Sequence, residues 1–154
     1  MILYAESSAV LSWLLGEPAA PLVRRELAAA ELVLTSDLTA VECRRGLVRA
    51  VKAGRLREGV AADRAARLLA ANAEWNQIRL ELPILERAGA PFPVEPVGTL
   101  DAIHLSSALT ARASLGPVAM LSLDHSVRQV AAALGFDLLP GELSQVEGGR
   151  SESK

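Results

Sequence analysis

Apolar positions along the chain fall into short continuous runs, separated by longer stretches in which they recur every three or four residues. The continuous runs predict buried strands over 1–5, 32–35 and 118–123. An alternating stretch predicts a strand over 77–82, and a short run predicts one over 136–139. The helical periodicity predicts helices over 7–15, 19–30, 37–53, 56–72, 83–88, 99–113 and 125–134.

This alternation of strands and helices predicts an α/β fold. Buried strands joined by helices form a parallel sheet with helices on both faces, which gives three layers. Neither an internal repeat nor a second domain is evident in the sequence. We therefore expect one domain over 1–140 and a flexible polar tail over 141–154.

The composition narrows the class of protein. A chain of 154 residues, 51% of them apolar, suits one folded domain with a full core. Aromatic residues make up only 3% of the chain, which disfavours binding of nucleic acid by stacking of bases on aromatic rings. The net charge is -2, so a nucleic-acid site would have to be a local basic patch. Cys43 is the one cysteine, which excludes an internal disulfide and predicts a buried thiol. We see no secretion signal or membrane span and expect a cytoplasmic protein.

Four acidic residues occupy comparable places in this pattern. Glu6 and Asp124 each follow a predicted buried strand, Asp101 opens a helix, and Glu42 lies early in the helix after the second strand. The carboxyl ends of parallel strands form one edge of the sheet, where ligands bind in such folds. Four carboxylates at one edge repel each other unless some are protonated or a cation binds. The set therefore indicates a site for Mg²⁺ or Mn²⁺, ions that polarise phosphates and acidify a bound water.

Each acid also has a purely structural explanation. Asp124 can cap its helix, and Thr99 or Asp101 can cap the helix over 99–113. That helix is expected to bury a face that includes Leu100, Ile103 and Leu109, with Ala102 and Ala108 beside them. The joint placement of all four acids favours a site over four separate caps.

The helix over 37–53 carries a basic stripe. Glu42, Arg45, Arg49 and Lys52 fall on one side at 100° per residue. The opposite, apolar side consists of Val41, Leu47, Val48 and Val51, with Arg44 projecting among these residues. The stripe can guide an RNA backbone toward the acids, and it can equally be a solvated face or meet an acidic partner protein. Arg44 either extends its charge to water or pairs with an acid at the site.

Three polar residues lie close to the acids in the sequence. Ser8, like its neighbour Ser7, is first of all a helix cap, and Ser122 either fills the edge of the sheet or hydrogen-bonds a metal-bound water. His104 lies one turn after Asp101, where it can touch a phosphate or fix a carboxylate. We expect it to be packed in the helix rather than catalytic. All three are kept as supporting residues.

Taken together, these segments resemble the PIN-domain nucleases, and most closely the toxin component of VapBC toxin–antitoxin modules. The matching segments are Leu3-Tyr4-Ala5-Glu6-Ser7-Ser8-Ala9-Val10, Leu38-Thr39-Ala40-Val41-Glu42, Thr99-Leu100-Asp101-Ala102-Ile103-His104, Leu121-Ser122-Leu123-Asp124 and Ala132-Ala133-Leu134-Gly135-Phe136. They cover about residues 1 to 140 in the expected order. Each segment is weak alone, and the ordered set is fairly specific.

The resemblance implies a five-stranded parallel sheet between helices and RNA cleavage with Mg²⁺ or Mn²⁺. The residues that match the family's metal-binding acids are Glu6, Glu42, Asp101 and Asp124. It further implies a homodimer and a cognate VapB-like antitoxin whose C-terminal segment covers the acidic site.

One residue departs from the family pattern, in which the first acid is ordinarily Asp. Here it is Glu6, whose extra methylene moves the carboxylate outward by roughly 1.3 Å relative to the short metal–oxygen distance of Mg²⁺. A weakened nuclease that only binds RNA or protein is therefore an alternative. A receiver-type phosphoacceptor domain also clusters acids at strand ends, but it needs a late Lys, and none occurs between Lys52 and Lys154.

Overall fold

A single parallel sheet forms the middle of the protein, as the alternation of strands and helices predicts. The computed structural model describes residues 1–141. The five strands run in the order β3-β2-β1-β4-β5, and Leu3 in β1 pairs with Val33 on one side and Ala119 on the other. The strands are β1 (Ile2–Ala5), β2 (Leu32–Ser36), β3 (Asn76–Ile78), β4 (Val118–Leu121) and β5 (Leu138–Leu139).

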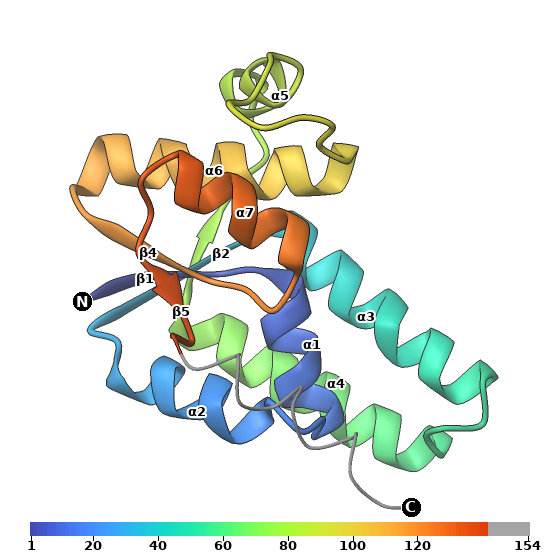
Figure 1. Ribbon diagram of the computed structural model, residues 1–154. Coiled ribbons are helices and arrows are strands. Elements are labelled where there is room, and N and C mark those ends of the chain that lie inside the picture. Colours follow the sequence, from blue (N-terminus) through green and yellow to red (C-terminus); the bar gives the residue numbers. More distant parts are fainter. Residues whose placement is uncertain (142–154) are drawn as a thin grey trace, which may run out of the picture.

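Helices cover both faces of the sheet (Figure 1). One layer contains α6 (Thr99–Leu115) and α7 (His125–Ala133), and α5 (Leu82–Ala88) packs on the side of α6 that faces away from the sheet. The other layer contains α1 (Ser7–Leu15), α2 (Ala20–Ala29), α3 (Asp37–Lys52) and α4 (Glu58–Glu74). None of the helices described over 1–141 combines the length and the apolar character that a membrane crossing requires.

The core consists of two clusters, one on each face. Tyr4 and Met120 point to the face covered by α6 and α7, where they pack with Leu105. Leu3 and Leu121 point to the opposite face and pack against the helices of the other layer. Because β1 and β4 are buried on both faces, their sequences are continuous apolar runs, which is why these two strands could be predicted.

The predicted strand over 77–82 is shorter than expected. It covers Asn76–Ile78, and α5 begins at Leu82 with Pro83 in its first turn. Proline is tolerated in the first turn of a helix, because backbone N–H groups there form no hydrogen bond within the helix. The alternation of apolar residues therefore continued past the end of the strand. The tail predicted over 141–154 lies, from residue 142 on, outside the described residues.

Two predicted helix faces also differ from those observed. In α6, Leu100 is 47% exposed, and the buried positions include Ala102, Leu105 and Ala108. In α3, Val41 and Val48 are exposed, although both were assigned to the apolar side. In both helices small residues form much of the contact face, because they let the helix approach its neighbours closely.

Close packing of α3 is clearest at Gly46 and Cys43. A Cβ at Gly46 would lie 2.5 Å from a methyl carbon of Leu11 in α1, so no larger residue fits without rearrangement. Cys43 is fully buried, as expected, and burial raises the pKa of its thiol to about 12. It is therefore an uncharged core residue at neutral pH.

Candidate active site

The amino ends of α1, α3, α6 and α7 gather at the carboxyl edge of the sheet, on the right of Figure 1. Glu6 and Asp124 directly precede α1 and α7, and Glu42 and Asp101 lie near the starts of α3 and α6. Helix amino ends carry partial positive charge and unpaired N–H groups. The fold therefore delivers four acids to a region that favours negative charge.

Glu6 is buried and its carboxylate is fully engaged in hydrogen bonds. Its Oε1 accepts from the Ser8 amide at 3.0 Å and from Ser7 Oγ at 2.6 Å. Its Oε2 accepts from Ser122 Oγ at 2.8 Å and from Ser8 Oγ. A carboxylate offers about four lone-pair directions. All of them are occupied here by groups of the protein, and Glu6 also serves as the N-cap of α1.

Ser7 joins Glu6 to Glu42. Its hydroxyl lies 2.6 Å from Oε1 of Glu6 and 2.7 Å from Oε2 of Glu42. A hydroxyl carries one proton, so it donates to one of the two carboxylates at a time. The close approach of two carboxylates around one proton indicates a site where a further positive charge is favoured.

His104 contacts the same oxygen of Glu42. Its Nε2 lies 2.6 Å from Oε2 of Glu42, and since a carboxylate only accepts, Nε2 carries the proton. Its Nδ1 lies 2.9 Å from the hydroxyl of Tyr4, and that hydroxyl also lies 3.1 Å from Ser36 Oγ. Burial by itself raises the pKa of Glu42, but hydrogen bonds from His104 and Ser7 outweigh it and hold that pKa below its ordinary value.

Asp101 and Asp124 complete the acidic edge. Partial burial, and then the negative charges of Asp124 and Glu6, raise the pKa of Asp101 above its ordinary value. Asp101 is therefore under the influence of the negative charges of Asp124, Glu6 and Glu42. Asp124 caps α7, with its Oδ1 accepting from the Val127 amide at 2.9 Å. Asp124 therefore caps its helix, which is the structural role considered for it from the sequence.

The donor set fits a divalent cation. One carboxylate oxygen each from Glu6 and Glu42 and one imidazole nitrogen of His104 lie within 4.8 Å of one another. Carboxylate oxygens suit Mg²⁺ and Mn²⁺. His104 stands beside these oxygens as a hydrogen-bond donor to Glu42, because its Nε2 carries a proton in this arrangement. Among residues 1–141 this is the one group of three whose ligand atoms come that close, and it contains His104 rather than Asp101 or Asp124.

Sequence reasoning missed two residues of this arrangement and misplaced two caps. Ser7 was considered only as a helix cap and Tyr4 only as part of a buried strand. Their signals were adjacency to Glu6 and alternation along β1, but neither reveals contacts with residues 35 and 100 positions away. The N-cap of α1 is Glu6, which accepts from the Ser8 amide, so neither Ser7 nor Ser8 caps that helix. The N-cap of α6 is Gly98, with no side-chain hydrogen bond, so neither Thr99 nor Asp101 caps it.

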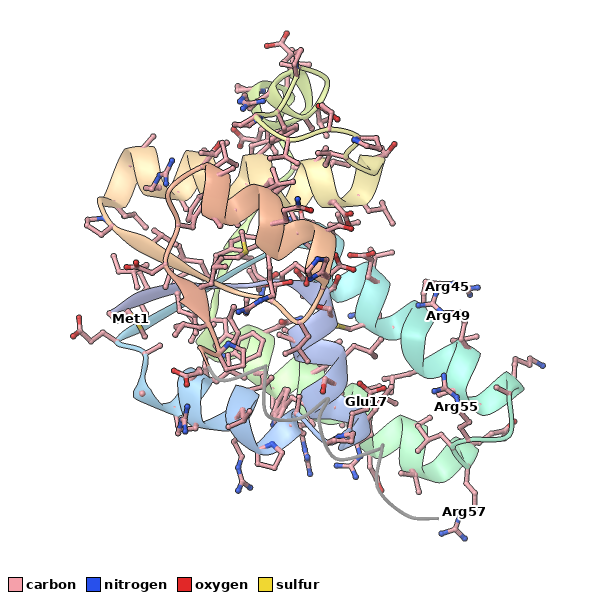
Figure 2. The ribbon with its side chains drawn as sticks, viewed as in Figure 1. Met1, Glu17, Arg45, Arg49, Arg55 and Arg57 are labelled. Atoms are coloured by element: carbon pink, nitrogen blue, oxygen red, sulfur yellow. The ribbon has the colours of Figure 1, made fainter. Side chains whose placement is uncertain are left out.

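The basic stripe of α3 extends outward from the site. Arg45 and Arg49 point away from the body of the domain (Figure 2). Arg44 is exposed and does not pair with an acid of the site; it lines a groove of about 360 Å³ between α3 and α4. Apolar side chains of Leu47, Val48 and Val51 form much of that groove.

The fold and the site together define a class of protein. It is a parallel α/β domain with an acidic centre, suited to a metal ion, at the carboxyl edge of its sheet. Within that class, the chain belongs to the PIN domain family, whose model matches residues 3–133. The expected resemblance is thereby confirmed.

Known proteins agree with this assignment. The chain is 31% identical over 137 residues to Ribonuclease VapC46 of Mycobacterium tuberculosis, which covers 89% of this chain and 95% of the relative. Two solved structures share the fold. VapC20 of Mycobacterium tuberculosis, described as a sarcin-ricin loop cleaving toxin, aligns with a TM-score of 0.61 at 16% identity, covering 87% of this chain and 95% of that one. VapBC2 of Rickettsia felis, solved bound to a promoter DNA fragment, aligns with a TM-score of 0.57 at 13% identity, covering 90% of this chain and 97% of that one.

Proposed function

We propose that this protein is a metal-dependent endoribonuclease that hydrolyses RNA phosphodiester bonds. The observation that carries the proposal is the convergence of Glu6 and Glu42 on one hydroxyl, with Asp101 close enough for their charges to raise its pKa. Such crowding is relieved by a divalent cation. The similarity to a ribonuclease of the same family supports RNA as the substrate.

Glu42, Asp101 and Asp124 would hold Mg²⁺ or Mn²⁺, with Glu6 assisting. When bound, the ion supplies charge stabilisation at the phosphodiester and lowers the pKa of a coordinated water. His104 and Ser7 orient the Glu42 carboxylate by donating to its Oε2, and they keep it ionised at neutral pH. Ser8 and Ser122 hold the Glu6 carboxylate at the edge of the sheet. Basic residues of α3 steer the RNA backbone, with Arg44, Arg45, Arg49 and Lys52 as contacts.

Cleavage of a labelled mixed RNA pool by the purified protein tests this proposal. Reactions with Mg²⁺, Mn²⁺ or EDTA are compared between the wild type and Asp101→Asn. We expect cutting that depends on the ion and is lost in the variant, whose fold is checked by circular dichroism. Full activity of Asp101→Asn would rule out the proposed metal set.

A second candidate is a weakened PIN domain that binds RNA or protein without turnover. Saturation of the Glu6 carboxylate favours it, because direct metal contact requires Glu6 to give up a hydrogen bond with Ser7, Ser8 or Ser122. Glu6→Asp distinguishes the two candidates. Cleavage by the wild type supports the nuclease, whereas cleavage that appears only in Glu6→Asp identifies a disabled site on an intact scaffold.

We further propose that the nuclease is the toxin of a type II toxin–antitoxin pair, located in the cytoplasm and dimeric in the absence of its partner. The likeness to VapC46 and to the VapBC2 structure supports a VapB-like antitoxin as the partner. The groove between α3 and α4, apolar inside and bordered by Arg44 and Lys52, suits an amphipathic acidic segment. Co-purification with the product of an adjacent reading frame, disrupted by Val48→Asp, tests this partner.

A further inference from the structure

A second polar pocket lies at the far end of α1 from the acids. It has a volume of about 450 Å³ and is formed where α1 ends against α2 and α4. Its lining includes Trp13, Glu17, Pro18, Arg24, Arg64 and Arg67. Because a helix rises about 1.5 Å per residue, Gly16 at the end of α1 is about 14 Å from Ser7 at its start. This arginine pocket is therefore separate from the candidate active site.

Three arginines from two helices line the arginine pocket. Arg64 and Arg67 are three positions apart on α4 and share one face of that helix, while Arg24 comes from α2. None of the three forms an ion pair or hydrogen bond with another residue in the described part of the chain. The contact of Arg67 is with the Trp13 ring, 5.9 Å from its centroid.

Two other arginines of the protein show what a structural role involves. Arg112 donates to the Leu134 carbonyl at 2.9 Å and lies over the Phe136 ring at 4.1 Å. Arg128 donates to three carbonyl oxygens near the end of β4 and around β5. Those side chains serve the fold, whereas the pocket arginines leave their N–H donors open. A structural role alone does not explain why three of them face one cavity.

The charge of the pocket favours an anion with several oxygen acceptors. Glu17 is the one acid in its lining, set against three guanidinium groups. A guanidinium presents a planar fork of donors that matches a phosphate with two parallel hydrogen bonds. A volume of about 450 Å³ also exceeds what a single phosphate needs, and pockets of this size hold nucleotide-sized ligands.

We propose that the arginine pocket binds a phosphate group carried by a nucleotide. Arg24, Arg64 and Arg67 donate to its oxygens, and the Trp13 ring borders the nucleoside part. The phosphate belongs either to a free nucleotide or to an RNA strand, and the chemistry of recognition is the same for both. The proposal does not depend on the acids at the sheet edge or on cleavage.

Tryptophan fluorescence provides a direct readout. The chain has two tryptophans: Trp13 lines this pocket, and the ring of Trp75 lies 5.9 Å from that of Trp13. The full-length protein is titrated in metal-free buffer with 5′-AMP, with a 5′-phosphorylated RNA decamer and with adenosine. We expect a saturable change with at least one phosphate-bearing probe and none with adenosine.

Two double variants that lose the same charge distinguish binding in the arginine pocket from general attraction of an anion to a positively charged protein surface. Arg64→Gln/Arg67→Gln removes two pocket arginines and should weaken binding at least about tenfold. Arg55→Gln/Arg57→Gln removes two exposed charges near the start of α4 (Figure 2) and should change it less than about twofold. Glu17→Gln removes the acid of the lining and should tighten binding about two- to fivefold.

The outcomes are distinct. Binding of 5′-AMP with loss in the pocket variant identifies a free nucleotide as a sufficient ligand, and binding of the decamer alone identifies an RNA strand. The proposal is overturned by equal binding of adenosine, by equal loss in both double variants, or by no saturable change with either phosphate-bearing probe. Stronger binding of a hexaglutamate peptide than of both phosphate-bearing probes would instead identify an acidic protein segment and also overturn it.

Discussion

Nε2 of His104 lies 2.6 Å from Oε2 of Glu42, although 62 positions separate the two residues in the sequence. The same carboxylate oxygen accepts from Ser7, and the other ring nitrogen of His104 contacts Tyr4. One acid of the candidate site is thus oriented by residues from β1, α1 and α6. His104 is therefore buried in its helix, as expected, and it also positions a carboxylate, which was the alternative considered for it.

Replacement of His104 should separate positioning from packing. His104→Gln leaves Glu42 without its buried N–H donor at the observed geometry, and we expect Mn²⁺ affinity to fall about 10- to 100-fold. Calorimetric titration with Mn²⁺ measures this directly and does not depend on cleavage. Tyr4→Phe is the matched control, because it removes only the hydroxyl beside Nδ1 and should cost about 1 kcal/mol of stability. Unchanged Mn²⁺ affinity in His104→Gln would contradict the positioning role.

Asp101→Asn should stabilise the protein in the absence of metal. Its pKa is raised in the folded state, so the ionised form is disfavoured there relative to the unfolded chain. This penalty is fully present above the folded pKa and disappears below the ordinary value of 3.8. We expect the melting temperature of the variant to exceed that of the wild type by roughly 1–4 °C at pH 7. The difference should vanish near pH 3, and a variant less stable at pH 7 would argue against charge crowding.

Adjacent leucines of α4 offer a test of the core. Leu68 is 1% exposed and belongs to the cluster beneath α1, whereas Leu69 is 64% exposed. Leu68→Ala should therefore lower the free energy of unfolding by about 2–5 kcal/mol, and Leu69→Ala by less than about 0.5 kcal/mol. Urea denaturation of the two variants measures the difference. Similar values would mean that α4 does not pack as described.

Loss of basic residues on α3 should weaken RNA binding in a salt-dependent way. Arg45→Gln/Arg49→Gln removes two phosphate contacts, so the slope of log affinity against log salt should fall by about 1.4 for a single strand. Arg45→Lys/Arg49→Lys keeps both charges and should preserve that slope. Filter binding of a catalytically inactive Asp101→Asn background over a salt series provides the measurement. An unchanged slope in the glutamine variant would exclude these two arginines as RNA contacts.

Much of the architecture could be predicted because burial on both faces leaves a simple pattern. The runs that became β1, β2 and β4 are continuous and apolar, and acids directly after β1 and β4 share an edge of the sheet by topology alone. The contacts between side chains at the site leave no comparable pattern in the sequence. The contacts of Ser7 with Glu42 and of Tyr4 with His104 join residues 35 and 100 positions apart, and local sequence does not encode such distances.

Helix faces were harder to predict than strands. Hydrophobicity favoured Val41, Val48 and Leu100 as buried positions, yet all three are exposed. The observed contact faces contain Gly46 and Ala102, because close approach of α3 to α1 and of α6 to the sheet requires small side chains. Residue size, rather than hydrophobicity, decided these faces.

The hydroxyl of Ser8 has a consequence for how the protein opens. It accepts from the backbone amides of Leu123 and Asp124, at 2.9 and 3.1 Å, while donating to Glu6. These amides follow β4 in a segment without strand pairing, where exchange with solvent deuterium is ordinarily fast. Bound to a serine 115 positions earlier, they exchange only when β4 and α1 separate. Slow exchange of these two amides would therefore report that the acidic edge is held to α1 and does not lie on a mobile loop.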